Sequence, residues 1–204
     1  MANDGKFKRQ KAGKTDYRKR LKALLSRQTR FTVRRALNSI RVQAINYNET
    51  GDQVVASAVS TELKKMGWKG HNGNIPAAYL TGALCAKKAL EKGVKDGVLD
   101  IGYATPVKNS AVFAAARGII DGGIAMPAGI EMDAGQYNGQ RIAAYAKTLE
   151  KDEYGKQFSS YLKNGFKPED LPKNFEEVAK KMGLAVKEAK PAEKKTVHAE
   201  KVKK

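Results

Sequence analysis

The sequence predicts an α/β protein in which a mixed sheet, made of a three-strand antiparallel meander and a further strand, carries packed helices. Between residues 30 and 59 the apolar side chains recur with a period of two in three successive runs. Beyond residue 75 the pattern changes to helix, strand and helix, which is typical of helices lying on a sheet. A basic N-terminal extension precedes this core and a helical C-terminal extension follows it.

The N-terminal extension predicts a basic arm with one short helix. Residues 1–14 contain almost no apolar side chain beyond Phe7, so we expect this lead to become ordered only on a partner. Thr15 and Asp16 are suitable N-caps for a helix in which one tyrosine and three leucines share a face: Tyr17, Leu21, Leu24 and Leu25. That face is small, so we expect it to dock on the protein itself rather than on a membrane.

The three β-like runs predict the meander. They cover residues 30–35, 40–47 and 53–59, with a turn at Leu37-Asn38-Ser39 and a loop over 48–52. The first two runs carry Arg and Gln on their polar face and contain no carboxylate. We therefore expect this face to attract anions.

A helix and a fourth strand follow a glycine-rich loop. The helix is expected over about residues 75–91, with Pro76 in its first turn, where no helical hydrogen bond is lost. A strand is expected over 98–101 and a second helix over about 112–120, with Ser110 as its cap. This order favours a mixed sheet with helices packed on it.

The C-terminal third predicts three helices. They are expected at about residues 140–150, at 154–163, and after Asn174, whose spacing to Glu177 matches a capping box. A proline-containing turn at 168–172 separates the last two. We expect these helices to fold back on the core.

Charge divides the chain unevenly among its expected segments. Residues 1–35 hold a net charge of +11 out of +18 and the last twenty residues hold +4, so the body between them is nearly balanced. The arm is rich in Arg, whose planar guanidinium suits phosphate, whereas the all-Lys tail fits a solvated surface equally well. The expected segments are a basic arm with a short helix (1–29), an α/β core that carries the anion-attracting face (30–125), a helical extension packed on it (126–184) and a disordered Lys-rich tail (185–204).

Other function classes find little support in the sequence. Gly13-Lys14-Thr15 lacks the first glycine of a phosphate-binding loop, and two histidines with the single Cys85 do not make a closed zinc site. Asp100 has no evident acidic partner for metal-dependent catalysis. We expect no enzyme, no metal and no cofactor. No apolar run reaches the roughly 20 residues of a membrane span, so we expect a soluble cytoplasmic protein with Cys85 in its core.

Several blocks follow one another in a characteristic order: Thr15-Asp16-Tyr17, Arg20-Leu21, Arg34-Arg35 with Asn38, Val54 to Ala58, Gly67-Trp68, Gly73 to Gly82, Val98 to Gly102, and Ala111 to Gly123. Together they resemble the family of large-subunit ribosomal protein eighteen, called large-subunit protein five in eukaryotes. The resemblance covers about residues 10 to 184, and the length fits the archaeal branch. It implies a scaffold protein that binds 5S ribosomal RNA in the central protuberance of the large subunit. It also implies contacts with the large-subunit ribosomal RNA and with neighbouring ribosomal proteins, including the other 5S-associated protein.

The candidate RNA-binding residues are the cations of the arm together with the polar groups of the first two strands and their turn. Arg, Asn, Ser and Tyr can hold the phosphates and 2′-hydroxyls of RNA helices or stack on unpaired bases. Trp68 and Tyr79 are expected in the core. The alternative function is a general nucleic-acid chaperone or DNA-compacting protein that uses the same arms. The candidates are Lys6, Lys8, Arg9, Lys11, Lys14, Thr15, Tyr17, Arg18, Arg20, Lys22, Arg27, Arg30, Arg34, Arg35, Asn38, Ser39, Arg41 and Asn74.

Overall fold

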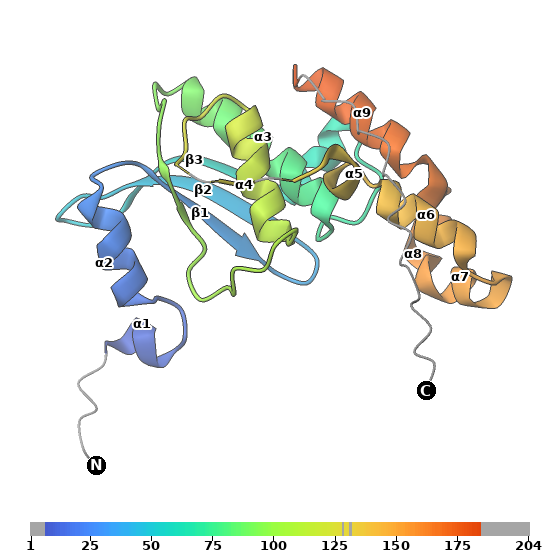
Figure 1. The fold of residues 1–204 in the computed structure, drawn as a ribbon, viewed down its shortest axis with the longest axis horizontal. Helices are drawn as coiled ribbons and strands as arrows, with labels where there is room; N and C mark the ends of the chain where they lie inside the picture. Colours follow the sequence, from blue (N-terminus) through green and yellow to red (C-terminus); the bar gives the residue numbers. More distant parts are fainter. Residues whose placement is uncertain (1–6, 128, 131, 185–204) are drawn as a thin grey trace, which may run out of the picture.

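A four-strand mixed sheet forms the centre of the protein in a computed structural model that describes residues 7–127, 129–130 and 132–184. The strand order is β3-β2-β1-β4 (Figure 1). The antiparallel meander consists of β1 (Arg30–Arg35), β2 (Ile40–Asn46) and β3 (Gln53–Val59), and β4 (Val98–Asp100) runs parallel to β1. The predicted mixed sheet is confirmed.

The pairing register gives the sheet a covered face and an open face. Phe31 and Val33 lie opposite Ala44 and Val42, and all four side chains are buried on the covered face. Helices α3 (Ile75–Leu90) and α4 (Ala111–Asp121) pack there (Figure 1). The open face carries Thr32 and its neighbours of the same parity, because successive side chains of a strand point to opposite sides.

Helices α3 and α4 approach closely, backbone to backbone. A Cβ atom added to Gly82 would collide with the carbonyl of Ala115, and one added to Gly118 would collide with the carbonyl of Tyr79. Small residues at these crossings let both helices lie on the same sheet face. The Tyr79 ring stacks on Tyr137 with ring centroids 4.2 Å apart, so the prediction that Tyr79 is a core residue is confirmed.

Two ionisable groups in this core are held neutral. Burial and the neighbouring Asp121 raise the pKa of Tyr79, whose hydroxyl donates to the Asp121 carboxylate at 2.9 Å. Burial also raises the pKa of Cys85 to about 12, so this thiol is a small core group, as predicted.

Replacing Gly118 with Ala should lower the free energy of unfolding by about 2 kcal/mol, because a backbone carbonyl blocks the added methyl group. Gly155 provides the matched control, since it lies within a helix with nothing close to its would-be Cβ. Gly155→Ala should leave stability unchanged or raise it by up to about 1 kcal/mol. Urea unfolding of both variants measures the difference, and equal stabilities would contradict the close helix contact.

The C-terminal helices differ from the prediction in two places. The helix expected over 154–163 is interrupted at Phe158, and the helix expected after Asn174 already begins at Leu171 with Pro172 in its first turn. The predicted capping box is therefore wrong. The observed elements are α5 (Ala134–Tyr137), α6 (Gln140–Thr148), α7 (Lys151–Gln157), α8 (Ser159–Lys163), the 3-10 turn η2 (Pro168–Asp170) and α9 (Leu171–Lys181).

Asn174 instead joins the extension to the core. Its buried side chain accepts from the backbone N–H of Lys69 at 3.0 Å and donates to the carbonyl of Gly67 at 2.9 Å. Both partners belong to the glycine-rich loop that follows the 3-10 helix η1 (Ser60–Met66). Ser110 stands at the N-cap position of α4, as predicted, but its hydroxyl makes no capping hydrogen bond.

The N-terminal lead is more ordered than predicted. Residues 8–11 form the short helix α1 (Lys8–Lys11), and the Phe7 ring lies 4.8 Å from the ring of Tyr17. Helix α2 (Tyr17–Leu25) begins as predicted, because the Asp16 carboxylate accepts from the N–H groups of Arg18 and Lys19. The predicted tail over 185–204 lies outside the described residues.

The apolar face of α2 docks only in part: Tyr17 and Leu24 are half-buried, whereas the predicted docking of Leu21 and Leu25 is wrong. Leu21 and Leu25 are 62% and 76% exposed. The lysine of α2 that reaches the core is Lys19, whose ammonium donates to the carbonyl of Gly102 at 3.2 Å. Among the described helices, none has both the length and the apolar character that crossing a bilayer requires.

Candidate nucleic-acid interface

A basic cleft of about 240 Å³ lies between the arm and the open face of the sheet. The arm supplies its outer wall, β1 and β2 supply its floor, and two acidic residues come from the loop before β3 and from β4. We call this site the basic cleft and define it by its lining residues: Arg9, Lys14, Thr15, Asp16, Arg20, Arg30, Thr32, Arg34, Gln43, Ile45, Asp52, Asp100 and Gly102.

Arg30 is the centre of a buried ion-pair network in this cleft. Its guanidinium is only 3% exposed and donates to the carboxylates of Asp52 at 2.7 Å and Asp100 at 3.2 Å. A buried guanidinium needs such partners, because an unpaired charge away from water is very costly. Arg30 therefore fixes the positions of both carboxylates beneath the cleft.

The same two carboxylates hold the cations that face solvent. Arg20 of α2 donates to Asp52 at 2.9 Å, and Arg34 of β1 donates to Asp100 at 3.3 Å and to the Asp100 carbonyl at 2.9 Å. Gly102 has a φ of +61°, and a Cβ there would lie 3.0 Å from the Arg34 guanidinium. Gly102 therefore allows Arg34 to lie flat against the loop after β4.

One further hydrogen bond attaches the arm to the core, and a second one lies within the arm. The Tyr103 hydroxyl donates to the carbonyl of Thr15 at 3.0 Å, and Arg9 donates to the Thr15 hydroxyl at 2.9 Å. Together with the Arg20–Asp52 pair, the Tyr103–Thr15 bond connects the arm to the loop before β3 and to the segment after β4, and Figure 1 shows α1 and α2 at one end of the sheet. The arm is thus presented as a shaped basic surface.

Several other cations of this surface form no ion pair within the described part of the chain. Arg34 and Arg41 lie directly opposite each other on β1 and β2, an arrangement of like charges that is destabilising unless an anion lies between them. Asp100 holds Arg34, whereas Arg41 is exposed and has no carboxylate partner among the described residues. The other exposed cations of the arm without such a partner are Lys8, Arg9, Lys11, Lys14, Arg18, Lys22 and Arg27.

Some predicted residues lie at the other end of β1, away from the basic cleft. Asn38 accepts from His71 at 3.4 Å, and Ser39 closes the β1–β2 turn through its backbone carbonyl. Asn74 caps α3 by accepting from the N–H of Ala77 at 2.9 Å. Arg35 is exposed and, together with Asn74, lines a separate groove next to Arg141. The structure therefore divides the predicted residues between two regions.

The remaining predicted residues are placed as follows. The half-buried Tyr17 has its ring against Phe7, and Arg27, directly after α2, adopts an unusual positive φ of 54°. Lys6 lies outside the described residues. The expectation that Trp68 belongs to the core is confirmed, since it is 3% exposed.

One part of the sequence reading of this surface was wrong. Arg30 was expected on an exposed polar face, but the structure buries it beneath the cleft because Asp52 and Asp100 reach it. The strands β1 and β2 contain no carboxylate, as predicted, and the two acids reach the open face from outside them. Alternation along β4 could have indicated that Asp100 lies near Arg30. Asp100 and Val98 are two residues apart, so their side chains point to the same face of the sheet, and Val98 pairs with Arg30.

The basic cleft is suited to bind a polyanion. Its fixed guanidiniums offer planar, multiple N–H donors, which match phosphate oxygens. Among the described residues, no group of three or more His, Cys, Asp or Glu side chains is placed to hold a metal ion.

Comparison with known proteins points to one family. Residues 3–97 match the family model described as ribosomal large subunit proteins 60S L5, and 50S L18. The large ribosomal subunit protein uL18 of Methanococcus maripaludis is 47% identical over 180 residues, which cover 86% of this chain and 93% of that protein. The protein of the same name from Methanobrevibacter smithii is 46% identical over 181 residues, which cover 88% of this chain and 94% of that protein.

Proposed function

Because this chain belongs to the family of ribosomal large-subunit proteins 60S L5 and 50S L18, we propose that it binds 5S ribosomal RNA in the central protuberance. Family membership makes it a structural protein of the cytoplasmic large ribosomal subunit, and not an enzyme. Its surroundings are therefore ribosomal RNA and other ribosomal proteins. The particular RNA and the residues that contact it belong to the proposal.

The basic cleft is the observation that carries this proposal. It combines the exposed Lys14 with guanidiniums that Asp52 and Asp100 hold in fixed positions. Mobile cations attract any phosphate, whereas fixed donors favour one arrangement of phosphates and 2′-hydroxyls. Such a surface fits a folded RNA better than a uniform double helix of DNA.

We propose different roles for the predicted residues according to their place. Lys14, Arg18 and Lys22 neutralise phosphates, Arg34 and Arg41 contact the backbone beside the sheet, and Arg30 acts only by positioning the acids. The other arm cations, Lys6, Lys8, Arg9, Lys11 and Arg27, extend the phosphate track. Asn38, Ser39 and Arg35 would contact a more distant part of the RNA.

The affinity for 5S ribosomal RNA should fall steeply with salt. If the arm and the first two strands neutralise about six to eight phosphates, log affinity against log salt should have a slope of about −4 to −7. Filter binding or fluorescence anisotropy with the full chain measures it. A slope shallower than about −2 would mean that too few phosphates are contacted for the basic cleft to be the RNA site.

A further inference from the structure

We propose that a second pocket, between the glycine-rich loop and α8, binds one unstacked nucleotide of ribosomal RNA. This inference rests on the proposed function only in taking ribosomal RNA as the source of the nucleotide. The pocket is separate from the basic cleft and shares no lining residue with it.

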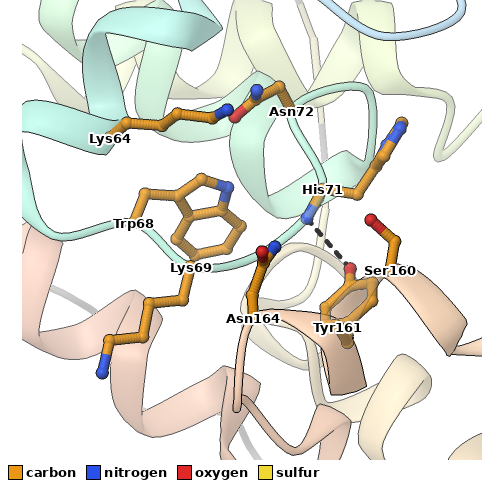
Figure 2. Close-up of a pocket in the computed structure, with 9 residues that line it drawn as sticks. Lys64, Trp68, Lys69, His71, Asn72, Ser160, Tyr161 and Asn164 are labelled. Carbon is orange, nitrogen blue, oxygen red and sulfur yellow. Dashed lines mark hydrogen bonds between the residues drawn. The ribbon is translucent and has the colours of Figure 1, made fainter.

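The pocket is formed by segments far apart in the sequence (Figure 2). It has a volume of about 360 Å³, within the usual range for small-molecule sites, and is lined by Lys64, Trp68, Lys69, Gly70, His71, Asn72, Ser160, Tyr161 and Asn164. The backbone N–H of His71 donates to the Tyr161 hydroxyl at 3.0 Å, which joins the two walls. Asn174 holds the loop from behind through Gly67 and Lys69.

Two buried polar atoms of the pocket have no partner among the described residues. They are the indole Nε1 of Trp68, a donor, and the amide Oδ1 of Asn72, an acceptor. Trp68 is 3% exposed, and Figure 2 shows its indole nitrogen on the side of the pocket where Asn72 lies. Leaving such groups unsatisfied costs about 1–3 kcal/mol each, so a ligand that offers both an acceptor and a donor would be favoured.

The charge of the pocket selects among ligands with those groups. Among the described residues no Asp or Glu lines it, whereas Lys64 and Lys69 both line it, are exposed and make no ion pair with a described residue. A nucleotide supplies an acceptor and a donor on its base edge and an anion on its phosphate. An unstacked nucleotide therefore matches the pocket better than an uncharged small molecule or a cation.

The pocket and the basic cleft lie in different parts of the molecule. Helices α1 and α2 lie at one end of the long axis of the molecule and α8 lies towards the other (Figure 1). A nucleotide held at α8 would thus come from a different stretch of RNA than the phosphates at the basic cleft. The protein would then connect two RNA segments through a rigid sheet.

Trp68 is the only tryptophan of the chain, so its fluorescence reports directly on the pocket. The full chain should be titrated with each of the four nucleoside 5′-monophosphates, with inorganic phosphate and with a carboxylate, N-acetylglutamate amide. We expect at least one nucleotide to change the Trp68 emission in a saturable way below about 10 mM. A nucleotide within bound RNA reaches an effective concentration of about this size, so such an affinity is sufficient. Phosphate and the carboxylate should bind more weakly.

Paired variants locate the binding. Lys64→Ala and Asn72→Ala should weaken that nucleotide by about fivefold or more, whereas Lys65→Ala, one residue away from the rim, should change it by less than about twofold. Melting curves show whether each variant is folded. The proposal is overturned if no nucleotide gives a saturable change, if phosphate or the carboxylate binds as well as the nucleotides, or if the folded Lys64 and Asn72 variants bind normally.

The two proposals fail separately. If no nucleotide changes the Trp68 fluorescence while the chain still binds 5S RNA, only the pocket proposal is overturned. A nucleotide response in a chain that does not bind 5S RNA would remove the proposed function and leave the pocket.

Discussion

Deletion of residues 1–28 should lower the affinity for 5S ribosomal RNA by at least about 100-fold at physiological salt. The deletion removes ten Lys and Arg, including the outer wall of the basic cleft, and each lost phosphate contact reduces both affinity and salt dependence. The fold should survive, because α1 and α2 contain no buried residue. Circular dichroism and melting of the truncated chain check this, and anisotropy with labelled RNA checks the affinity.

The C-terminal tail, which is also basic, supplies the control deletion. Deletion of residues 185–204 removes seven Lys and three Glu, and we expect it to reduce the affinity by less than about tenfold, since these lysines contribute only sequence-independent attraction for phosphate. Comparable losses from both deletions would show that net charge, and not the cleft, determines binding. If the chain lacking residues 1–28 keeps its affinity for 5S RNA, the basic cleft is not the RNA-binding site.

Replacing Arg30 with Ala should lower the free energy of unfolding by about 3 kcal/mol, because it leaves two carboxylates beneath the cleft without their shared buried partner. Arg20 and Arg34 would then lose the fixed geometry of Asp52 and Asp100. RNA affinity should fall as well, although Arg30 touches no RNA in this account. Urea unfolding measures the first effect and RNA titration at low temperature, where the variant is folded, measures the second.

Arg41 is the matched control for that substitution. It lies on the neighbouring strand with the same charge, but it is exposed and has no carboxylate partner among the described residues. Arg41→Ala should leave stability within about 0.5 kcal/mol and still weaken RNA binding severalfold. If Arg30→Ala and Arg41→Ala destabilise equally, the ion-pair network does not support the cleft.

Local sequence signals predicted the elements that depend on local chemistry. The alternation of Phe31 and Val33 with polar residues placed β1 correctly, and Asn74 before Pro76 marked the start of α3. The cap of α2 at Asp16 was equally clear. These features need only neighbouring residues, so no knowledge of the rest of the chain was required.

The errors concern contacts between distant segments. Arg30 reaches Asp52 and Asp100, which are 22 and 70 residues away, and only the pairing of β4 with β1 brings Asp100 close. Asn174 resembled a helix cap, yet its side chain is used by the glycine-rich loop more than 100 residues earlier. A period along one strand indicates which face a residue occupies, but it does not reveal which acids fold over that face.

The most direct test of the proposed function compares 5S ribosomal RNA with duplex DNA of equal charge in parallel salt titrations of the full chain. If the fixed donors of the basic cleft recognise folded RNA, 5S RNA should bind at least about 100-fold more tightly than the duplex at every salt concentration, because geometry-dependent contacts remain when counterion release is reduced. Equal affinities, falling together as salt rises, would contradict this account and would identify the protein as a general nucleic-acid chaperone or DNA-compacting protein.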